Sequence, residues 1–181
     1  MLALTPTPLP HWVRGDRRSG RGRIIRLVER QEIIAALRAL PDQIDQHTRD
    51  LSDDQLRRQT PDDWSILEVC CHLRDSAQEE GLRVRRLVEE ESPTLEPYDQ
   101  EAWAIERNYR GDDFGRVRTA VRAFFGGLAY QLEGLSDEQW ERGGLHPERG
   151  PVTVRSRAEA EAEHAREHVA QIEAIRAAPG R

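Results

Sequence analysis

Four long segments of this 181-residue chain repeat apolar residues every three or four positions, which is the spacing of one face of an α-helix. The clearest segment lies between residues 112 and 133, and its apolar positions are Phe114, Val117, Val121, Phe124, Leu128 and Leu132. A stripe of this kind packs against other helices. No segment shows the pattern of a convincing β-strand. We therefore predict an all-α fold, a four-helix bundle with one core.

The other three helices are predicted over residues 30–49, from Ser65 to before Pro93, and over residues 156–177. Capping boxes, in which a Ser and an acidic residue three positions later bond each other's backbone, are expected at Ser65 with Glu68 and at Ser156 with Glu159. Pro41 lies inside the first helix and is expected to kink or split it.

Residues 92–111 form a connection between the second and third helices, with a short helix expected at 101–107. A connection of this length can cross the bundle, so the two helices it joins can run parallel. Residues 51–58 and residues 135–142 have nearly the same sequence, and each segment follows a long helix. Ser52 and Gln55 in the first copy match a capping box. The repetition hints at two similar halves.

The composition excludes several kinds of protein. The chain contains no lysine, so a lysine Schiff base, a P-loop lysine and a Ser-Lys pair are excluded. No apolar run approaches the ~18 residues of a membrane helix. The only cysteines are the neighbours Cys70 and Cys71, which cannot form an extracellular disulfide framework. We interpret Cys70 as a core residue and Cys71 as lying away from the core stripe, and we expect free thiols in the cytoplasm.

Residues 1–23 differ from the rest and are predicted to form a basic arm rich in Pro, Gly and Arg, with residues 24–181 forming the bundle. Residues 1–30 hold seven Arg against Asp16 and Glu29, a net charge of +5, so the remainder carries −11 of the total of −6. The arm could contact nucleic acid through its arginines and Trp12. The alternative is a plain tail. The acidic body makes nucleic acid an unlikely partner.

Two histidines stand four residues apart in the last predicted helix. His164 and His168 share the apolar face with Ile172 and Ile175, so both imidazoles point inward. A pair of this kind is either half of a metal site or a structural feature of the core. His72 lies in the first half of the second helix near its core face, and helix bundles build metal sites from side chains on facing helices. We therefore predict a metal site at His72, His164 and His168.

Three stretches of the chain resemble the DinB/YfiT-like superfamily. They are the Trp-Ser and His-Leu phrases within residues 64–75, the loop 146–154, and the segment 163–172 around the two histidines. The resemblance implies an up-down-down-up four-helix bundle, a frequent homodimer, and a three-histidine metal site that maps to His72, His164 and His168. His146 matches a loop position and is not expected to be a ligand. Many members carry a further histidine where this chain has Glu167.

A three-histidine site leaves coordination positions open, as in catalytic rather than structural zinc sites. Imidazole ligands suit several metals, so the expected cofactor is a divalent cation, Zn or Ni. The resemblance implies a metal-dependent enzyme that activates a low-molecular-weight thiol, such as mycothiol or bacillithiol, for S-transfer or isomerisation of a small-molecule substrate. The alternatives are a metal-dependent hydrolase and a non-catalytic, stress-related bundle with a structural metal.

Further residues are predicted around this site. Glu68, Asp75 and Glu163 could orient the histidines from a second layer, or they could be ordinary acids of helix surfaces. Trp103 and Tyr109 belong to an aromatic cluster in the connection 92–111 and are predicted to line the substrate pocket.

Overall fold

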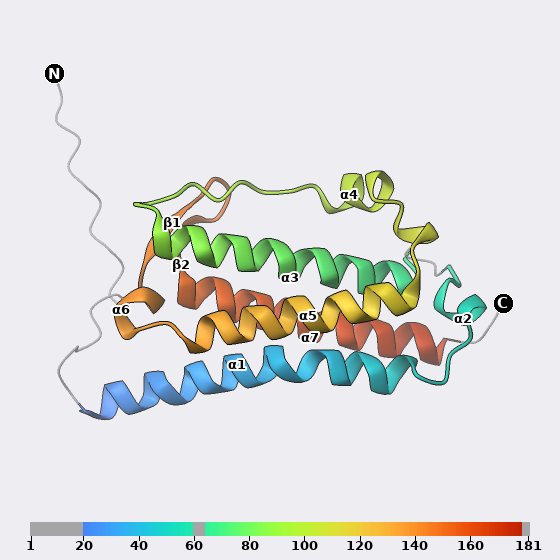
Figure 1. Cartoon of the computed structure of the whole chain (residues 1–181), viewed down its shortest axis with the longest axis horizontal. Coiled ribbons are helices and arrows are strands. Elements are labelled where there is room, and N and C mark those ends of the chain that lie inside the picture. The colour runs from blue at the N-terminus through green and yellow to red at the C-terminus, as the bar shows by residue number, and fades with distance from the viewer. Residues whose placement is uncertain (1–19, 60–63, 179–181) are drawn as a thin grey trace, which may run out of the picture. The chain divides into compact units, whose positions relative to one another are not determined.

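The computed structural model describes residues 20–59 and 64–178, and the chain divides into two compact units, residues 1–32 and 33–181. Of the first unit it describes the start of the helix α1 (Gly20–Thr48), which continues into the second. The second unit contains the long helices α3 (Ile66–Glu89), α5 (Phe114–Glu133) and α7 (Val154–Ala177). Together with residues 33–48 of α1 they form the predicted four-helix bundle (Figure 1).

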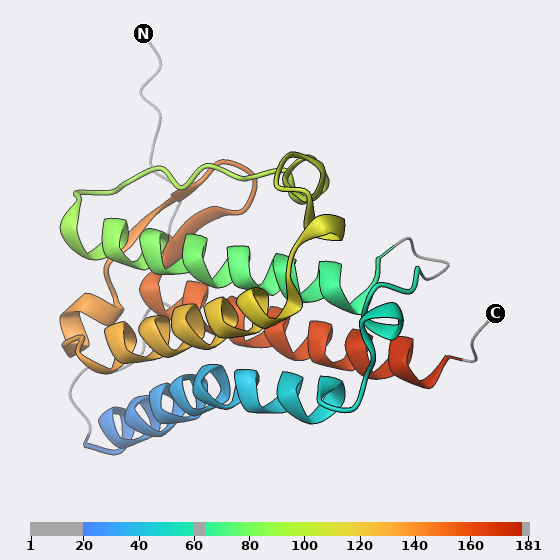
Figure 2. The same cartoon turned by 45° about the vertical axis from the view of Figure 1, so that its right-hand side comes forward.

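The helices run in the predicted up-down-down-up order. In Figures 1 and 2, α1 and α7 run in one direction and α3 and α5 in the other. Helix α3 packs against both α5 and α7. The crossover that joins the parallel helices α3 and α5 runs back beside α3 and contains α4 (Gln100–Glu106) and a 3-10 turn, η2 (Tyr109–Gly111). The crossover therefore covers one side of α3.

The predicted apolar stripes form the core. On α3, every position of the predicted stripe is buried: Ile66, Val69, Leu73, Ala77, Val84 and Leu87. On α5 the fully buried aromatic residue is Phe125, and Phe124 is only partly buried. Cys70 is buried as predicted, but the prediction that Cys71 lies away from the core was wrong. The crossover covers Cys71, whose Sγ lies 3.9 Å from the carbonyl oxygen of Tyr109.

Local signals for helix starts were mostly confirmed. The two similar segments, residues 51–58 and 135–142, form the short helices α2 (Asp53–Leu56) and α6 (Asp137–Trp140). Each helix begins with a capping box made by a Ser and a Gln. The box of Ser65 and Glu68 opens α3. The box predicted at Ser156 was misplaced, because Thr153 caps α7 and bonds to Ser156 as its third residue.

Helix α1 differs from its prediction in two respects, its first residue and the effect of Pro41. It begins at Gly20, ten residues before the predicted start at Arg30, and it runs through Pro41 without a break. The predicted arm therefore overlaps α1 at residues 20–23, and residues 1–19 lie outside the described part of the chain.

The prediction of no strand was wrong. Strands β1 (Gly143–His146) and β2 (Gly150–Thr153) form an antiparallel hairpin in which Gly143 pairs with Thr153 and His146 with Gly150. The crossover supports β1, because the Leu145 amide donates to Pro93 O at 2.9 Å and the Leu95 amide donates to Leu145 O at 2.8 Å.

A glycine allows the hairpin to pack this closely on the crossover. A Cβ at Gly144 would lie 2.4 Å from the carbonyl oxygen of Pro93, so no other residue fits without movement of the backbone. The crossover and β1 are far apart in sequence. No local sequence pattern therefore predicted the strands. Among the helices of the described residues, none is long and apolar enough to span a membrane.

Candidate metal centre

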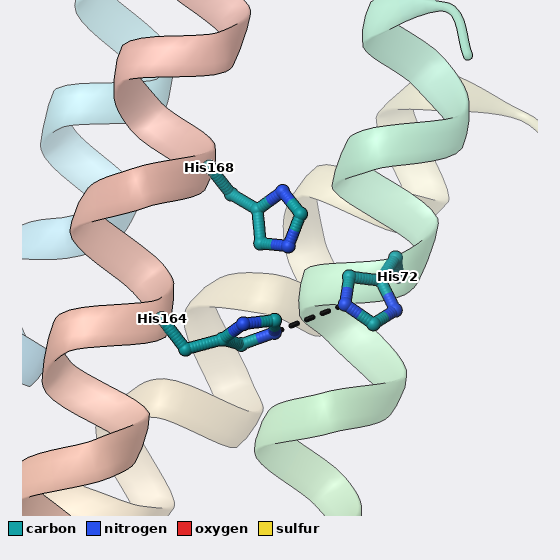
Figure 3. Close-up of side chains that lie close together, drawn as sticks. All are labelled: His72, His164 and His168. Atoms are coloured by element: carbon teal, nitrogen blue, oxygen red, sulfur yellow. Dashed lines mark hydrogen bonds between the residues drawn. The ribbon is translucent and has the colours of Figure 1, made fainter. Parts of the chain in front are cut away.

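The three predicted ligands come together at the interface of α3 and α7. His72 lies two turns into α3 and is almost fully buried, whereas His164 and His168 lie one turn apart on α7 and are partly buried. Figure 3 shows the three rings pointing toward one another from the two helices. Each residue offers a nitrogen, and the three nitrogens all lie within 4.8 Å of one another.

The rings meet edge to face. The centroid distances are 5.0 Å for His72 and His164, 4.8 Å for His72 and His168, and 4.4 Å for His164 and His168. Nε2 of His72 lies 3.0 Å from Nε2 of His164 (Figure 3). Trp64 packs its edge against His72 at 5.4 Å and so covers one side of the cluster.

Burial keeps the imidazoles neutral. Burial, with a smaller effect from neighbouring histidines, lowers the pKa of His72 to about 3 and that of His164 to about 4. Burial also lowers the pKa of His168. Neutral imidazoles carry the lone pairs that metal binding requires.

One hydrogen bond fixes the orientation of His168. Its Nδ1 lies 2.7 Å from Oε1 of Gln171, one turn further along α7. Because an amide oxygen only accepts, Nδ1 carries the proton and Nε2 keeps its lone pair for a ligand. A metal-binding histidine is usually held in this way by an acceptor at its other nitrogen. No role was predicted for Gln171 from the sequence, although its spacing of three from His168 was the available signal.

The donor set fits a divalent cation. Two neutral Nε2 atoms 3.0 Å apart, as in His72 and His164, repel each other unless a proton or a cation lies between their lone pairs. Two ligands of a tetrahedral zinc ion, each about 2.0–2.1 Å from it, lie roughly 3.3–3.4 Å apart. The nitrogens of His72 and His164 lie slightly closer than this, and all three nitrogens lie within 4.8 Å of one another. The described residues contain no other cluster that could hold a metal.

A cavity of 450 Å³ opens beside the histidines, bounded by α3, the crossover, the hairpin and α7. His72 and His164 line its wall. Other lining residues are exposed, so the cavity is open to solvent. The other buried or half-buried polar residues of the wall are Ser76, Glu80, Arg83, Tyr98, His146, Arg157 and Glu161. A wall this polar is suited to a polar ligand.

The predicted second-layer acids bond to groups other than the histidines. Glu68 accepts hydrogen bonds from Ser65 and Arg110, and Asp75 accepts from Tyr109 and Arg74. Glu163 pairs with Arg166 on the exposed side of α7. Asp75 still acts on His72 through its charge, which raises the pKa of that histidine against the effect of burial.

The two predicted pocket aromatics lie in different surroundings. Trp103 stacks on Tyr98 with centroids 4.1 Å apart, and Tyr98 lines the cavity. Tyr109 is buried, and its hydroxyl donates to Asp75 at 2.7 Å. Tyr98, which lies in the same connection between α3 and α5, is the aromatic residue that borders the cavity.

His146 and the cysteines have other roles. His146 is a wall residue whose Nδ1 accepts from the backbone amides of Glu148 and Arg149, both at 3.3 Å. As expected, it is not one of the converging ligands. Burial raises the pKa of both cysteine thiols, that of Cys71 to about 12, so neither is a thiolate nucleophile at neutral pH.

Known proteins match both the chain and the fold. A family model described as the DinB superfamily matches residues 36–172. A Bacillus subtilis protein named as a candidate metal-dependent hydrolase, YfiT, is 26% identical over 146 residues, which cover 80% of this chain and 82% of the relative. A Bacillus cereus protein with the same functional name is 28% identical over 148 residues, which cover 79% of this chain and 83% of that protein.

The solved structure of Bacillus subtilis YfiT, described as a four-helix bundle of unusual topology, superposes on this chain with a TM-score of 0.76. The two are 25% identical, and the match covers 81% of this chain and 85% of the other. Sequence and structure therefore point to the same relative.

Proposed function

This chain belongs to the DinB superfamily, and on that premise we propose that it is a metal-dependent hydrolase whose divalent cation is held by His72, His164 and His168. The observation that carries the proposal is the convergence of three neutral imidazoles from two helices, of which those of His72 and His164 line a 450 Å³ cavity. The functional names of the relatives from Bacillus subtilis and Bacillus cereus support the same reading.

The protein's own residues have distinct tasks in this proposal. When bound by these three neutral ligands, a cation would keep its full charge and would supply Lewis-acid chemistry toward a carbonyl group and water at neutral pH. The imidazoles hold it, and Gln171 fixes the ring of His168. The polar wall of the cavity binds and orients a small polar substrate beside the histidines.

Transfer or isomerisation with a low-molecular-weight thiol is the second candidate. The feature that favours it is a pair among the three arginines of the cavity wall, Arg83 and Arg149, because guanidinium groups can bind the carboxylates or sugar hydroxyls of such thiols. The two candidates differ in one requirement: thiol transfer needs added thiol for turnover, and hydrolysis does not.

The test uses tag-free protein loaded with Zn²⁺ or with Ni²⁺ and measures metal per chain and hydrolysis of a panel of esters and amides. His72→Ala and His168→Ala are expected to lose the metal and the activity. His47→Ala removes a histidine from the end of α1, away from the site, and is the matched control that should keep both.

Each outcome selects one reading. Hydrolysis without added thiol supports the proposal, and turnover that appears only with mycothiol or bacillithiol selects thiol transfer instead. A bound metal whose removal by a chelator lowers the melting temperature, without turnover under either condition, indicates a structural metal. Wild type that binds no metal after loading contradicts all three. The homodimer implied by the family and the cytoplasmic location predicted from the cysteines stay predictions.

A further inference from the structure

A series of polar pairs crosses the interface between α3 and α7, starting at the histidines. On α3 the paired residues are four apart, and on α7 they are three and four apart, so each set lies along one face of its helix. We call this series the polar ladder, and its pairs are His72 with His164, Ser76 with Glu161, and Glu80 with Arg157. All of its members line the cavity.

The carboxyl group of the middle pair has an unusual environment. Glu161 is 3% exposed, and Ser76 donates to it from a hydroxyl that lies 3.0 and 2.9 Å from its two oxygens. The nearest cation of the ladder, Arg157, uses two nitrogens to bond Glu80 instead. Within the described residues, no guanidinium hydrogen-bonds to Glu161. The group is thus a buried carboxyl without a paired cation.

A carboxyl group in such a place favours its neutral form. Burial, and after it the negative charge of Glu80, raises the pKa of Glu161, which lies at about 8. The hydrogen bond from Ser76 and the charges of Arg157 and Arg83 act in the opposite direction without cancelling the rise. The titratable and charged groups that border the same cavity from other elements are Tyr98 on the crossover and His146, Glu148 and Arg149 on the hairpin.

We propose that Glu161 is a catalytic proton donor, which gives its carboxyl proton to the leaving group of a substrate held at the histidine end of the cavity. This inference rests on the hydrolytic function proposed above. Glu161 lies three residues before His164 on α7, a rise of about 4.5 Å along the helix. Because Glu161, His164 and His72 line the same cavity, a substrate bound at the histidines lies near this carboxyl group.

The proton balance of the step is complete with water as the second reactant. The oxygen of water bonds to the carbonyl carbon of an ester or amide, and the bond from that carbon to the leaving oxygen or nitrogen breaks. The electron pair of the broken bond takes the proton of Glu161, and the proton released by water returns to the Glu161 carboxylate. The products are a carboxylic acid and an alcohol or amine. The substrate class is therefore a polar carbonyl compound whose leaving group must be protonated.

The decisive experiment compares two esters of one acid on the metal-loaded protein, an ethyl ester and a 4-nitrophenyl ester. Ethoxide is a poor leaving group that needs a proton, whereas 4-nitrophenolate leaves without one. E161Q is expected to lower kcat on the ethyl ester by about 10²–10⁴-fold. It should leave kcat on the nitrophenyl ester nearly unchanged and metal content unchanged. E173Q makes the same change at an exposed position of α7 and is the matched control.

A second readout does not depend on turnover. The infrared difference spectrum of wild type minus E161Q at pH 7 should contain the C=O stretch of a protonated carboxyl group. If that band is absent, or if E161Q affects both esters equally, the donor role is overturned. A metal-loaded wild type that hydrolyses neither ester overturns the hydrolytic function and the donor role with it, an outcome distinct from the two before.

Ser76 supplies a variant that changes the donor without removing it. Because its hydroxyl stabilises the charged form of Glu161, Ser76→Ala should raise the pKa of that carboxyl group. The alkaline limb of the rate on the ethyl ester should then move to higher pH, and Ser76→Thr should restore it. An unmoved limb in Ser76→Ala contradicts the assignment.

Discussion

Helix α3 has two neighbours in the bundle, and it meets them with opposite chemistry. Toward α5 it packs against an apolar seam whose fully buried members include Phe125 and Leu132. Toward α7 it presents the polar ladder, and the buried small residues of α7 are alanines: Ala158, Ala162 and Ala165. One helix thus supports the fold on one side and carries the chemistry on the other.

The two interfaces should contribute differently to stability. Apolar burial on the α5 side stabilises the folded chain directly. On the α7 side, burying a carboxyl group and an ion pair costs desolvation, which their hydrogen bonds only offset. We therefore infer that the role of the polar ladder lies in the cavity and not in stability. The apolar interface with α5 supplies the stability that the ladder does not.

The largest effect is expected from breaking the apolar side. Phe125→Ala removes a fully buried ring and leaves a cavity, so the free energy of unfolding should fall by about 3–5 kcal/mol. Tyr130→Ala, on the same helix but 77% exposed, should change it by less than about 0.5 kcal/mol. Chemical denaturation of both variants checks the pair. Similar losses in the two would mean that the seam is not where α5 stabilises the bundle.

This apolar side was also the part of the fold that the sequence predicted best. The spacing of Val117, Val121 and Leu128 depends only on the helical repeat, and all three are buried. Capping boxes such as that of Ser65 are equally local. The hairpin was missed because the crossover that supports β1 is distant in sequence, and because Gly144 in β1 and Pro151 in β2 give the two strands little strand propensity.

A smaller effect sharpens the comparison on the polar side. Gln171→Ala removes the acceptor that orients His168, so affinity for the bound cation should fall by about 10–100-fold. Metal-binding titrations measure this change. The metal-free variant should unfold with almost wild-type stability, in contrast to Phe125→Ala. Gln171→Glu keeps an acceptor at the same place and should retain affinity. If Gln171→Ala bound the metal normally, the hydrogen bond would have no part in holding it.

The candidate site was predictable only in part. His72, His164 and His168 are distinctive residues in helices of recognisable phase, so their convergence could be anticipated from spacing. Glu161 could not, because it stands among many acids in the repeated Ala-Glu sequence before His164, and nothing local marks which of them is buried. Its environment arises from Ser76 and Glu80 on another helix, and only the packing of α3 on α7 reveals it.

The last prediction is a pH dependence that isolates Glu161. Its pKa is raised to about 8 in the folded protein, against about 4.3 in an unfolded chain. Between these values the folded state holds a proton that the unfolded state has released. The stability that this proton contributes is fully present below about pH 4.3 and is lost as the pH rises through about 8, by up to about 1.4 kcal/mol per pH unit.

The measurement is the free energy of unfolding of wild type and E161Q between pH 5 and 9, with chelator present so that metal binding does not enter. The wild-type value minus the E161Q value should fall up to about pH 8 and level off above it. The buried histidines have lowered pKa values, so they act with the opposite sign, but they are common to both proteins and cancel in the difference. E173Q should follow wild type throughout. A flat difference would mean that Glu161 is ionised in the folded chain, and the polar ladder would then hold a buried charge where we infer a neutral acid.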